Sequence, residues 1–230
     1  MRFYETTPTH DLTYSDVFLV PSRSSVTSRL DVSLAPGDGT GATIPVVSAN
    51  MNSVTGPRLA ATLARRGGLG VLPQDMPLQQ LDAAIRWVKS QPVEYDTPYT
   101  LDAGQTVDAA LSTVPAVEGH GIVLHDADGA YLGCIAASRL ATAPRDAVLG
   151  DLLHGALTSL DADDVEGPRA AFDRLVAADL DFAPVLRHGR VVGTVSRKSA
   201  LRSTLYQPAL DAGGRLRVAA AVGINGDVAE

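Results

Sequence analysis

The sequence predicts a mixed α/β protein in which alternating strands and helices are interrupted by a repeated α+β segment. Residues 44–76, IPVVSANMNSVTGPRLAATLARRGGLGVLPQDM, contain a strand, a loop, a helix and a second strand in about thirty residues, the size of one βαβ unit. The motifs GAYLG (129–133) and GRVVG (189–193) share one glycine spacing at an offset of 60 residues. These two observations predict the fold class α/β with an inserted pair of repeats.

The first βαβ unit has clear boundaries. The run TIPVVS (43–48) is apolar and β-branched, as expected for a strand buried on both faces. Pro57 stands where a first-turn proline belongs, and Gly67 and Gly68 end the predicted helix. The polar loop therefore lies at the carboxyl end of the first strand.

A second strand and a second helix follow directly. LGVLP (69–73) predicts the strand, and PLQQLDAAIRWVKSQ (77–91) predicts the helix, again with proline at its start. Strand, helix, strand, helix is the order of a parallel sheet or an α/β barrel. The apolar face of the second helix carries Leu78, Leu81, Ile85 and Val88.

The repeated region breaks this alternation. Each glycine motif follows a hydrophobic run, GIVLHDAD or FAPVLRH, and precedes a strand and a helix. This pattern predicts a β-hairpin in each copy. A helical pattern precedes each hairpin, so the two copies are expected to form a pseudo-symmetric pair that packs sheet against sheet. After the pair, LRVAAAVG (216–223) predicts a further strand from Leu216 to Val222.

Composition excludes several classes of protein. The net charge of −7 provides no basic field for nucleic acid or for an anionic membrane surface. The single cysteine, Cys134, excludes an internal disulfide framework and fits a reducing compartment. No apolar window reaches membrane-helix length, and the histidines show no metal-ligand spacing, so we expect a cytoplasmic protein without a metal site.

Three stretches resemble the IMP dehydrogenase/GMP reductase family: LTYSDVFLVPSRSSV (12–26), the βαβ unit from Ile44, and LRVAAAVG. The repeats resemble the tandem cystathionine-β-synthase (CBS, or Bateman) domain that members of this family carry as an insertion. The resemblance implies the N-terminal part of a (β/α)8 TIM barrel in residues 1–91 and a CBS pair in 92–208. The repeats would span about 92–150 and 151–208, and 209–230 would return to the barrel.

A closed barrel of this kind needs about 200 residues or more outside insertions, whereas roughly 115 remain here. We therefore expect that the sequence is truncated at Glu230 or that the missing half lies elsewhere. The resemblance implies a nucleophilic cysteine on a later loop, with a possible monovalent cation there. Cys134 lies in the first repeat and is not that residue.

The implied activity is purine nucleotide interconversion by an oxidoreductase. The motif ANM (49–51) favours the reductase branch, NADPH-dependent deamination of GMP to IMP in purine salvage. A CBS insertion is more typical of the dehydrogenase branch, NAD-dependent oxidation of IMP to XMP. The resemblance also implies homo-oligomers, tetramers through barrels and octamers through CBS pairs.

By resemblance, the loop after the first strand would bind the substrate nucleotide. Ala49, Asn50 and Met51 would line the pocket, with Met51 against the purine or ribose, and Asn52 would support the loop. Family members commonly have aspartate where this chain has Asn52, which weakens any role that needs a charge. The alternative is that these residues only close a βα turn.

The CBS pair would hold an allosteric effector, ATP or GTP. Such pairs use an aspartate six residues after the hairpin glycine to bind ribose, but Arg139 and Ser199 occupy those positions. Thr194, Ser196, Arg197 and Lys198 still offer hydroxyls and positive charge suited to phosphate. The alternatives are a degenerate pair that serves as a dimerising spacer, or a catalytically incomplete fragment that acts only as a nucleotide-sensing module.

Overall fold

The computed structural model describes residues 3–4, 7–153 and 159–223. The chain divides into two compact units, Met1–Ser33 and Leu34–Glu230. The first unit contains two short 3-10 helices, η1 (Tyr14–Asp16) and η2 (Arg29–Asp31). Most of its large apolar side chains are open to solvent, with Tyr14 100% and Phe18 92% exposed. This unit therefore contributes no core of its own among its described residues.

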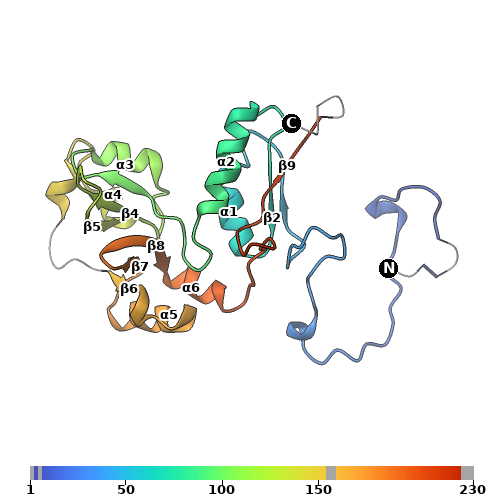
Figure 1. Ribbon diagram of the computed structural model, residues 1–230. Helices are drawn as coiled ribbons and strands as arrows, with labels where there is room; N and C mark the ends of the chain where they lie inside the picture. The colour runs from blue at the N-terminus through green and yellow to red at the C-terminus, as the bar shows by residue number, and fades with distance from the viewer. Residues whose placement is uncertain (1–2, 5–6, 154–158, 224–230) are drawn as a thin grey trace. The chain divides into compact units, whose positions relative to one another are not determined.

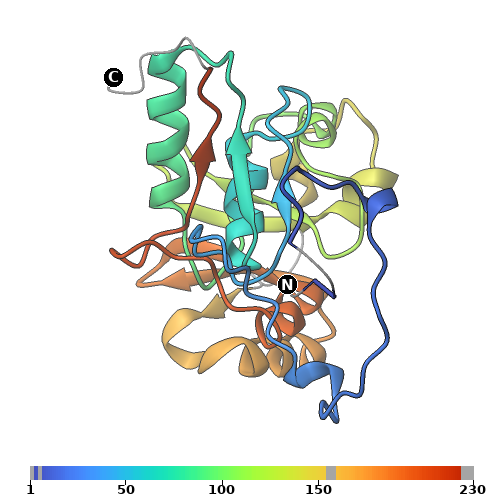
Figure 2. The ribbon, with the colours of Figure 1, turned by 90° about the vertical axis from the view of Figure 1, so that its right-hand side faces the viewer.

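The second unit begins with a parallel-sheet region that we define as residues 43–91 and 209–223. Its strands are β1 (Val47–Ser48), β2 (Leu69–Leu72) and β9 (Ala219–Ala220). They pair in the order β1-β2-β9, and both pairings are parallel. The helices α1 (Pro57–Arg65) and α2 (Leu78–Ser90) lie on the same side of β2 and β9 (Figures 1 and 2).

Two predictions for these strands need correction. β1 is not buried on both faces, because Val47 is 59% exposed at the edge of the sheet. β9 has two residues, whereas the apolar run predicted a strand from Leu216 to Val222. In its place Leu210 and Leu216 form an isolated antiparallel bridge, which turns the chain before it enters the sheet.

The α1 helix packs on β2 through its smallest side chains. Ala60, Ala61 and Ala64 are buried, whereas Leu59 is exposed. A Cβ atom on Gly70 would lie 2.5 Å from Cα of Ala60, so the helix and strand backbones approach as closely as glycine allows. Small residues on both elements thus set the distance between helix and sheet.

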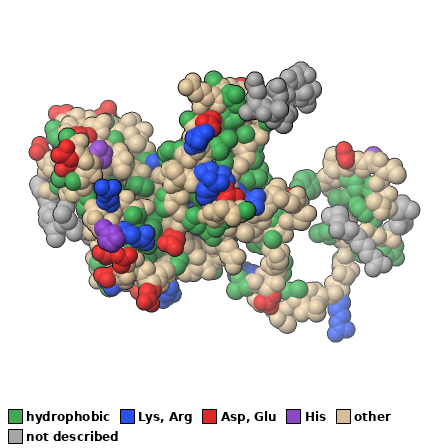
Figure 3. All heavy atoms as spheres, viewed as in Figure 1, with side chains coloured by type: hydrophobic (Ala, Val, Ile, Leu, Met, Phe, Trp, Pro, Cys, Tyr) green, Lys and Arg blue, Asp and Glu red, His purple; other side chains and the backbone are tan. Residues whose placement is uncertain are grey.

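The α2 helix is covered only near its C-terminal end, where Val88 and Ala84 are buried and Leu78 is exposed. Figure 3 shows basic and acidic side chains on the surface of this region, and on α2 itself Arg86 pairs with Asp82 at 2.8 Å. Lys89 also pairs at 2.8 Å with Asp211 in the returning segment. None of the helices among the described residues is long and apolar enough to cross a membrane.

The predicted internal repeat is confirmed. The first repeat (residues 99–153) contains β3 (Thr100–Asp102), α3 (Val107–Thr113), β4 (Gly121–His125), β5 (Tyr131–Ala136), α4 (Ala137–Thr142) and η3 (Leu149–Leu152). The second repeat (residues 159–206) contains β6 (Leu160–Asp161), η4 (Ala162–Asp164), α5 (Gly167–Ala177), β7 (Phe182–Arg187), β8 (Arg190–Ser196) and α6 (Arg197–Ser203).

The two repeats have the same sheet topology. In each one a short strand pairs parallel to the first strand of an antiparallel hairpin, giving the orders β3-β4-β5 and β6-β7-β8. The repeats touch where Phe182 covers Gly121, since a Cβ there would lie 2.7 Å from the Phe182 ring. The two repeats thus share one topology and contact each other at this point.

The segment between α2 and the first repeat, residues 92–98, belongs to neither repeat alone. Asp96 forms an isolated antiparallel bridge with Thr194 of β8, and Tyr95 packs against the core of the second repeat. This entry segment therefore passes alongside the second repeat before the first repeat begins.

Candidate functional site

The carboxyl ends of the three parallel strands meet at one edge of the sheet. The loops that follow β1 and β2, residues 49–56 and 73–77, and the residues after β9 all lie at this edge. Barrel enzymes place their ligand contacts at this end of parallel strands. The predicted substrate loop therefore occupies the expected end of the sheet.

Thr55 shapes this loop. Its buried hydroxyl donates to the carbonyl of Ala49 and lies 2.9 Å from the Ser48 hydroxyl. The amides of Val54 and Thr55 both donate to the carbonyl of Met51 at 2.9 Å. The loop is thus closed by its own backbone together with the Thr55 hydroxyl, and residues 49–54 remain exposed.

The predicted substrate residues are all exposed. Ala49, Asn50 and Asn52 lie on the surface, and the Met51 side chain is 55% exposed. An exposed thioether next to an open strand edge is suited to pack against a flat apolar group such as a purine. The structure thus brings the four residues into one loop, and their role as ligands stays a prediction.

Asn52 joins the loops after β1 and β2. Its amide Nδ2 donates to a carboxylate oxygen of Asp75 at 2.6 Å. Sequence reasoning assigned Asn52 to loop support but did not find Asp75, which lies 23 residues further on. No local pattern could identify this pair, because only the parallel pairing of β1 with β2 brings the two loops together.

This contact predicts the effect of replacing Asn52 by aspartate, the residue that members of the resembled family commonly have at this position. In Asn52→Asp, two carboxylates would face each other at hydrogen-bond distance without a shared donor, and we expect a loss of about 0.5–1 kcal/mol in unfolding free energy. Urea unfolding of the variant measures this loss.

The double variant Asn52→Asp with Asp75→Asn restores one amide and one carboxylate. It should recover most of the wild-type stability. If it is as unstable as the single variant, the hydrogen bond does not link the loops in solution.

The predicted effector residues separate into two groups. Thr194, Ser196 and Lys198 line a cavity of about 200 Å³ between the repeats and α1. Arg197 does not line it, because its guanidinium donates to the Leu180 carbonyl at 2.7 Å and pairs with Asp179 at 3.1 Å. A structural ion pair therefore accounts for Arg197.

The two hydroxyls in this cavity already have partners. The Thr194 hydroxyl donates to the Asp96 carbonyl at 3.3 Å. Ser196 caps α6, because its hydroxyl accepts from the Ser199 amide at 3.1 Å. Both residues are buried, so Lys198 is the most accessible of the predicted effector residues in the cavity.

Helix α1 contributes arginines that sequence reasoning missed. Arg58 donates to the carbonyls of Thr97 and Pro98 at 2.9 and 3.0 Å, and its guanidinium lies 3.8 Å from the centroid of the Tyr99 ring. Arg58 lines the 200 Å³ cavity. The available signal was the pair Arg58 and Arg65, seven residues or about two helical turns apart on α1, but their partners lie in the entry segment.

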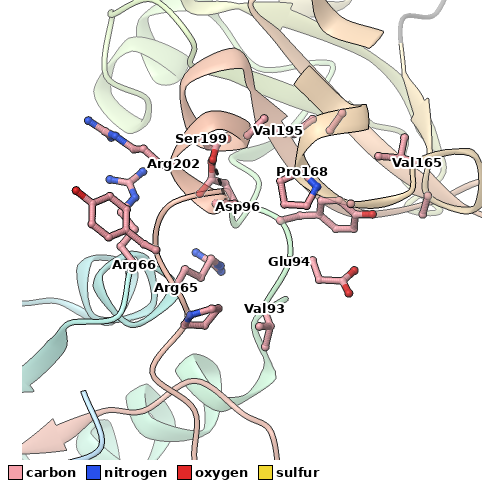
Figure 4. Close-up of a pocket in the computed structure, with 18 of the residues that line it drawn as sticks. Arg65, Arg66, Val93, Glu94, Asp96, Val165, Pro168, Val195, Ser199 and Arg202 are labelled. Carbon is pink, nitrogen blue, oxygen red and sulfur yellow. Dashed lines mark hydrogen bonds between the residues drawn. The ribbon is translucent and has the colours of Figure 1, made fainter. Parts of the chain in front are cut away.

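A second cavity, of about 270 Å³, lies beside the first (Figure 4). Figure 4 shows Arg65, Arg66 and Arg202 at one side and Val165 and Pro168 at the other. The two cavities share a wall made of Arg66, Asp96, Val195, Ser199 and Arg202.

Cys134 lies on β5, in the first repeat and outside these cavities. Burial raises the pKa of its thiol, although a hydrogen bond from Tyr131 opposes the shift. A raised pKa disfavours the thiolate that nucleophilic catalysis requires. Cys134 itself is partly buried on this strand.

Residues 11–230 match the model of the IMP dehydrogenase / GMP reductase domain. The chain belongs to this family. The resemblance inferred from the sequence is therefore confirmed, and the family match extends over the first unit from residue 11, the parallel-sheet region and both repeats.

Curated members of the IMP dehydrogenase/GMP reductase family include close relatives. GMP reductases of Mycobacterium tuberculosis and Mycobacterium bovis are 42% identical over 99% of this chain, and the alignment covers 47% of each relative. The IMP dehydrogenase of Nitrosopumilus maritimus is 28% identical over 95% of this chain and 47% of its own length. The chain thus spans about half the length of the curated family members it matches.

Solved family structures agree with the fold. A cysteine-to-alanine variant of Trypanosoma brucei GMP reductase matches with a TM-score of 0.51 and 25% identity, covering 93% of this chain and 50% of that one. The same enzyme in complex with guanosine 5'-monophosphate gives a TM-score of 0.59 at 24% identity, covering 93% and 47%. The mixed α/β chain thus aligns with part of the GMP reductase barrel structures.

Proposed function

We propose that this chain is part of a GMP reductase, in which the parallel-sheet region begins a (β/α)8 barrel and the two repeats form a regulatory CBS pair. The observation that carries the proposal is the 42% identity to mycobacterial GMP reductases along 99% of the chain, against 28–30% for the IMP dehydrogenases compared. The order of elements supports the barrel, because β1, β2 and β9 are neighbours in a parallel sheet.

The proposed reaction converts GMP, NADPH and two protons into IMP, NADP+ and ammonium. The C2 amino group of the purine leaves as ammonia, and NADPH, when bound, supplies the hydride that replaces it. The loop at residues 49–56 would bind and orient the purine, with Met51 against its face. Residues 49–56 carry no charged side chain, which suits contact with the uncharged edge of a base.

The described strand edge does not fit the phosphates of a dinucleotide. Asp75 is the only charged side chain in the loops at 49–56 and 73–77, and its carboxylate would repel them. None of these residues is therefore assigned to the cofactor.

The proposed CBS pair would sense purine nucleotides, ATP or GTP, in the 200 Å³ cavity. Lys198 and Arg58 supply positive charge there, and Thr194 and Ser196 supply hydroxyls. The Trypanosoma brucei reductase has been solved with guanosine 5'-triphosphate, which supports GTP as a probe. We further propose homo-oligomers, with tetramers formed through barrels and octamers through CBS pairs.

Assays on the protein that carries this chain separate the candidate functions. A reductase oxidises NADPH and releases ammonia when GMP is present. An IMP dehydrogenase, the second candidate because the matched family model covers both enzymes, reduces NAD when IMP is present. A nucleotide-sensing module without catalysis does neither but binds ATP or GTP.

Met51 provides a residue-level prediction. Because a well-packed methionine contributes about 1.5–3 kcal/mol when buried, Met51→Ala should raise KM for GMP about tenfold or more. The change should fall mainly on KM, since the side chain is proposed to bind and not to react. Steady-state kinetics of GMP-dependent NADPH oxidation measure both constants.

Val117→Ala is the matched control, because Val117 is an apolar side chain of similar exposure in the first repeat. It should leave both constants unchanged. An unaltered KM in Met51→Ala would show that residues 49–52 only close the βα turn.

A further inference from the structure

The wall shared by the two cavities contains two arginines from different regions. Arg66 follows α1 of the parallel-sheet region, and Arg202 lies in the last turn of α6 in the second repeat. Both arginines line both cavities (Figure 4). They are half-buried and close enough to repel each other electrostatically.

These two guanidinium groups differ from the other cations around the cavities in having no ion pair or side-chain hydrogen bond in the described part of the chain. The other cations around the cavities are mostly engaged: Arg58 with backbone carbonyls, Arg65 with Pro92 and Thr97, and Arg187 with Asp163 at 3.5 Å. Within the described part of the chain, neither Arg66 nor Arg202 forms an ion pair or a side-chain hydrogen bond. Burial lowers the pKa of Arg66, with Arg202 adding to the shift and Asp96 opposing it.

Two unpaired like charges that share a half-buried wall are costly unless an anion lies between them. Asp96 is the carboxylate in this wall, but it forms no ion pair with either arginine in the described structure. The Tyr206 phenol lines the 270 Å³ cavity and interacts electrostatically with Arg66. One anionic group could therefore contact the guanidinium groups of Arg66 and Arg202 and the hydroxyl of Tyr206.

The lining of the two cavities indicates which kind of ligand would carry the anionic group. Beyond the arginines, the lining of the larger cavity is largely apolar, with Val93, Tyr95, Val165, Pro168, Ala171 and Val195, and its carboxylates are those of Glu94 and Asp96. The smaller cavity is polar and contains Lys198 and the repeat hydroxyls. A ligand with a flat apolar body and a phosphate fits this combination better than a free inorganic ion.

We propose that Arg66 and Arg202 together hold one phosphate group of a purine nucleotide, which thereby bridges α1 of the parallel-sheet region and α6 of the second repeat. This rests on the proposed nucleotide sensing and adds residues outside the predicted effector set. The bridge lies only in the second repeat, because Thr142 occupies the position equivalent to Arg202 in the first. It would couple ligand binding to α1, whose N-terminus follows the loop that carries Met51.

A competing explanation needs no ligand. Both arginines lie at helix C-termini, where a cation interacts favourably with the terminal carbonyls. In that case their removal lowers stability and leaves nucleotide affinity unchanged.

Calorimetric titration of the whole chain with ATP, GTP, AMP and inorganic tripolyphosphate tests the proposal. Arg66→Gln and Arg202→Gln should each weaken ATP or GTP binding about tenfold or more, because each removes a charge-assisted contact. Arg202→Lys should keep most of the affinity. Arg139→Gln is the matched control, since Arg139 is an exposed basic residue in the last turn of the equivalent helix α4 and lines neither cavity.

The outcomes separate the two proposals, with fluorescence of the single tryptophan, Trp87, confirming that each variant is folded. Nucleotide binding that is equal in all variants overturns the arginine site and leaves nucleotide sensing intact. Arginine-dependent binding of tripolyphosphate without nucleotide binding supports the anion site but overturns its assignment to a nucleotide. No binding of any phosphate compound overturns both.

Discussion

Replacement of Arg65 by alanine is expected to lower the free energy of unfolding by about 3 kcal/mol. Arg65 is 8% exposed, and its Nε donates to the Pro92 carbonyl at 2.7 Å while Nη2 donates to the Thr97 hydroxyl. The truncation leaves both acceptors without their partner and opens a cavity under α1. Urea unfolding followed by Trp87 fluorescence measures the loss.

Arg86→Ala is the control, because Arg86 is exposed on α2 and forms a surface pair with Asp82. It should lower stability much less than Arg65→Ala does. The Nη1 atom of Arg65 has no hydrogen-bond partner among the described residues, so the site also carries an unfavourable term. An Arg65→Ala loss no larger than the Arg86→Ala loss would show that this term cancels the two hydrogen bonds.

Arg65→Lys adds a test by pH. Burial lowers the pKa of Arg65 to about 10, and the same burial should push the pKa of a lysine at this position below its usual value of about 10.4. Between the lowered pKa of the lysine in the folded state and its usual pKa in the unfolded chain, the folded state binds fewer protons than the unfolded chain. The stability of Arg65→Lys should therefore rise with pH from 7 to 9. Wild-type Arg65 stays largely charged over this range, and the rise should be absent in the wild type relative to the variant.

Gly70→Ala is expected to cost about 3 kcal/mol. The added Cβ would lie 2.5 Å from Cα and 2.6 Å from Cβ of Ala60, which is fully buried on α1. Neither partner is a flexible side chain, so β2 and α1 must move apart and lose packing along the helix. Thermal and urea unfolding measure the loss.

Gly37→Ala provides the matched control, since no atom lies within 4 Å of a Cβ built there. Its stability should stay close to that of the wild type. If Gly70→Ala is equally mild, then α1 and β2 do not approach each other this closely in solution.

Predictions succeeded where the determinants are local in sequence. Pro57 and Gly67 mark the ends of α1 because proline fits the first turn of a helix and glycine adopts a positive φ, here 88°. The hairpins of both repeats follow from their glycine spacing and apolar runs. The repeat offset then predicted matching topologies, which the structure confirms.

Predictions were incomplete where burial depends on partners far away in the chain. The apolar pattern of α2 selects Leu78, but the described part of the chain covers this helix only near Val88. The sequence likewise indicates a βα loop at Ala49–Asn52 but not the contact with Asp75. Of the predicted effector residues, Arg197 does not line the cavity, because its guanidinium pairs with Asp179, a residue 18 positions earlier in the chain.

The sequence alone determined the family, the βαβ beginning and the internal repeat, because short-range periodicity and turn residues encode helices, strands and hairpins. Only the tertiary structure decided which charges meet. The Arg65 and Arg58 contacts to the entry segment, and the shared wall of Arg66 and Arg202, join residues separated by up to 136 positions. Such pairs depend on how separate elements pack, and packing is set by the whole core, which no local pattern records.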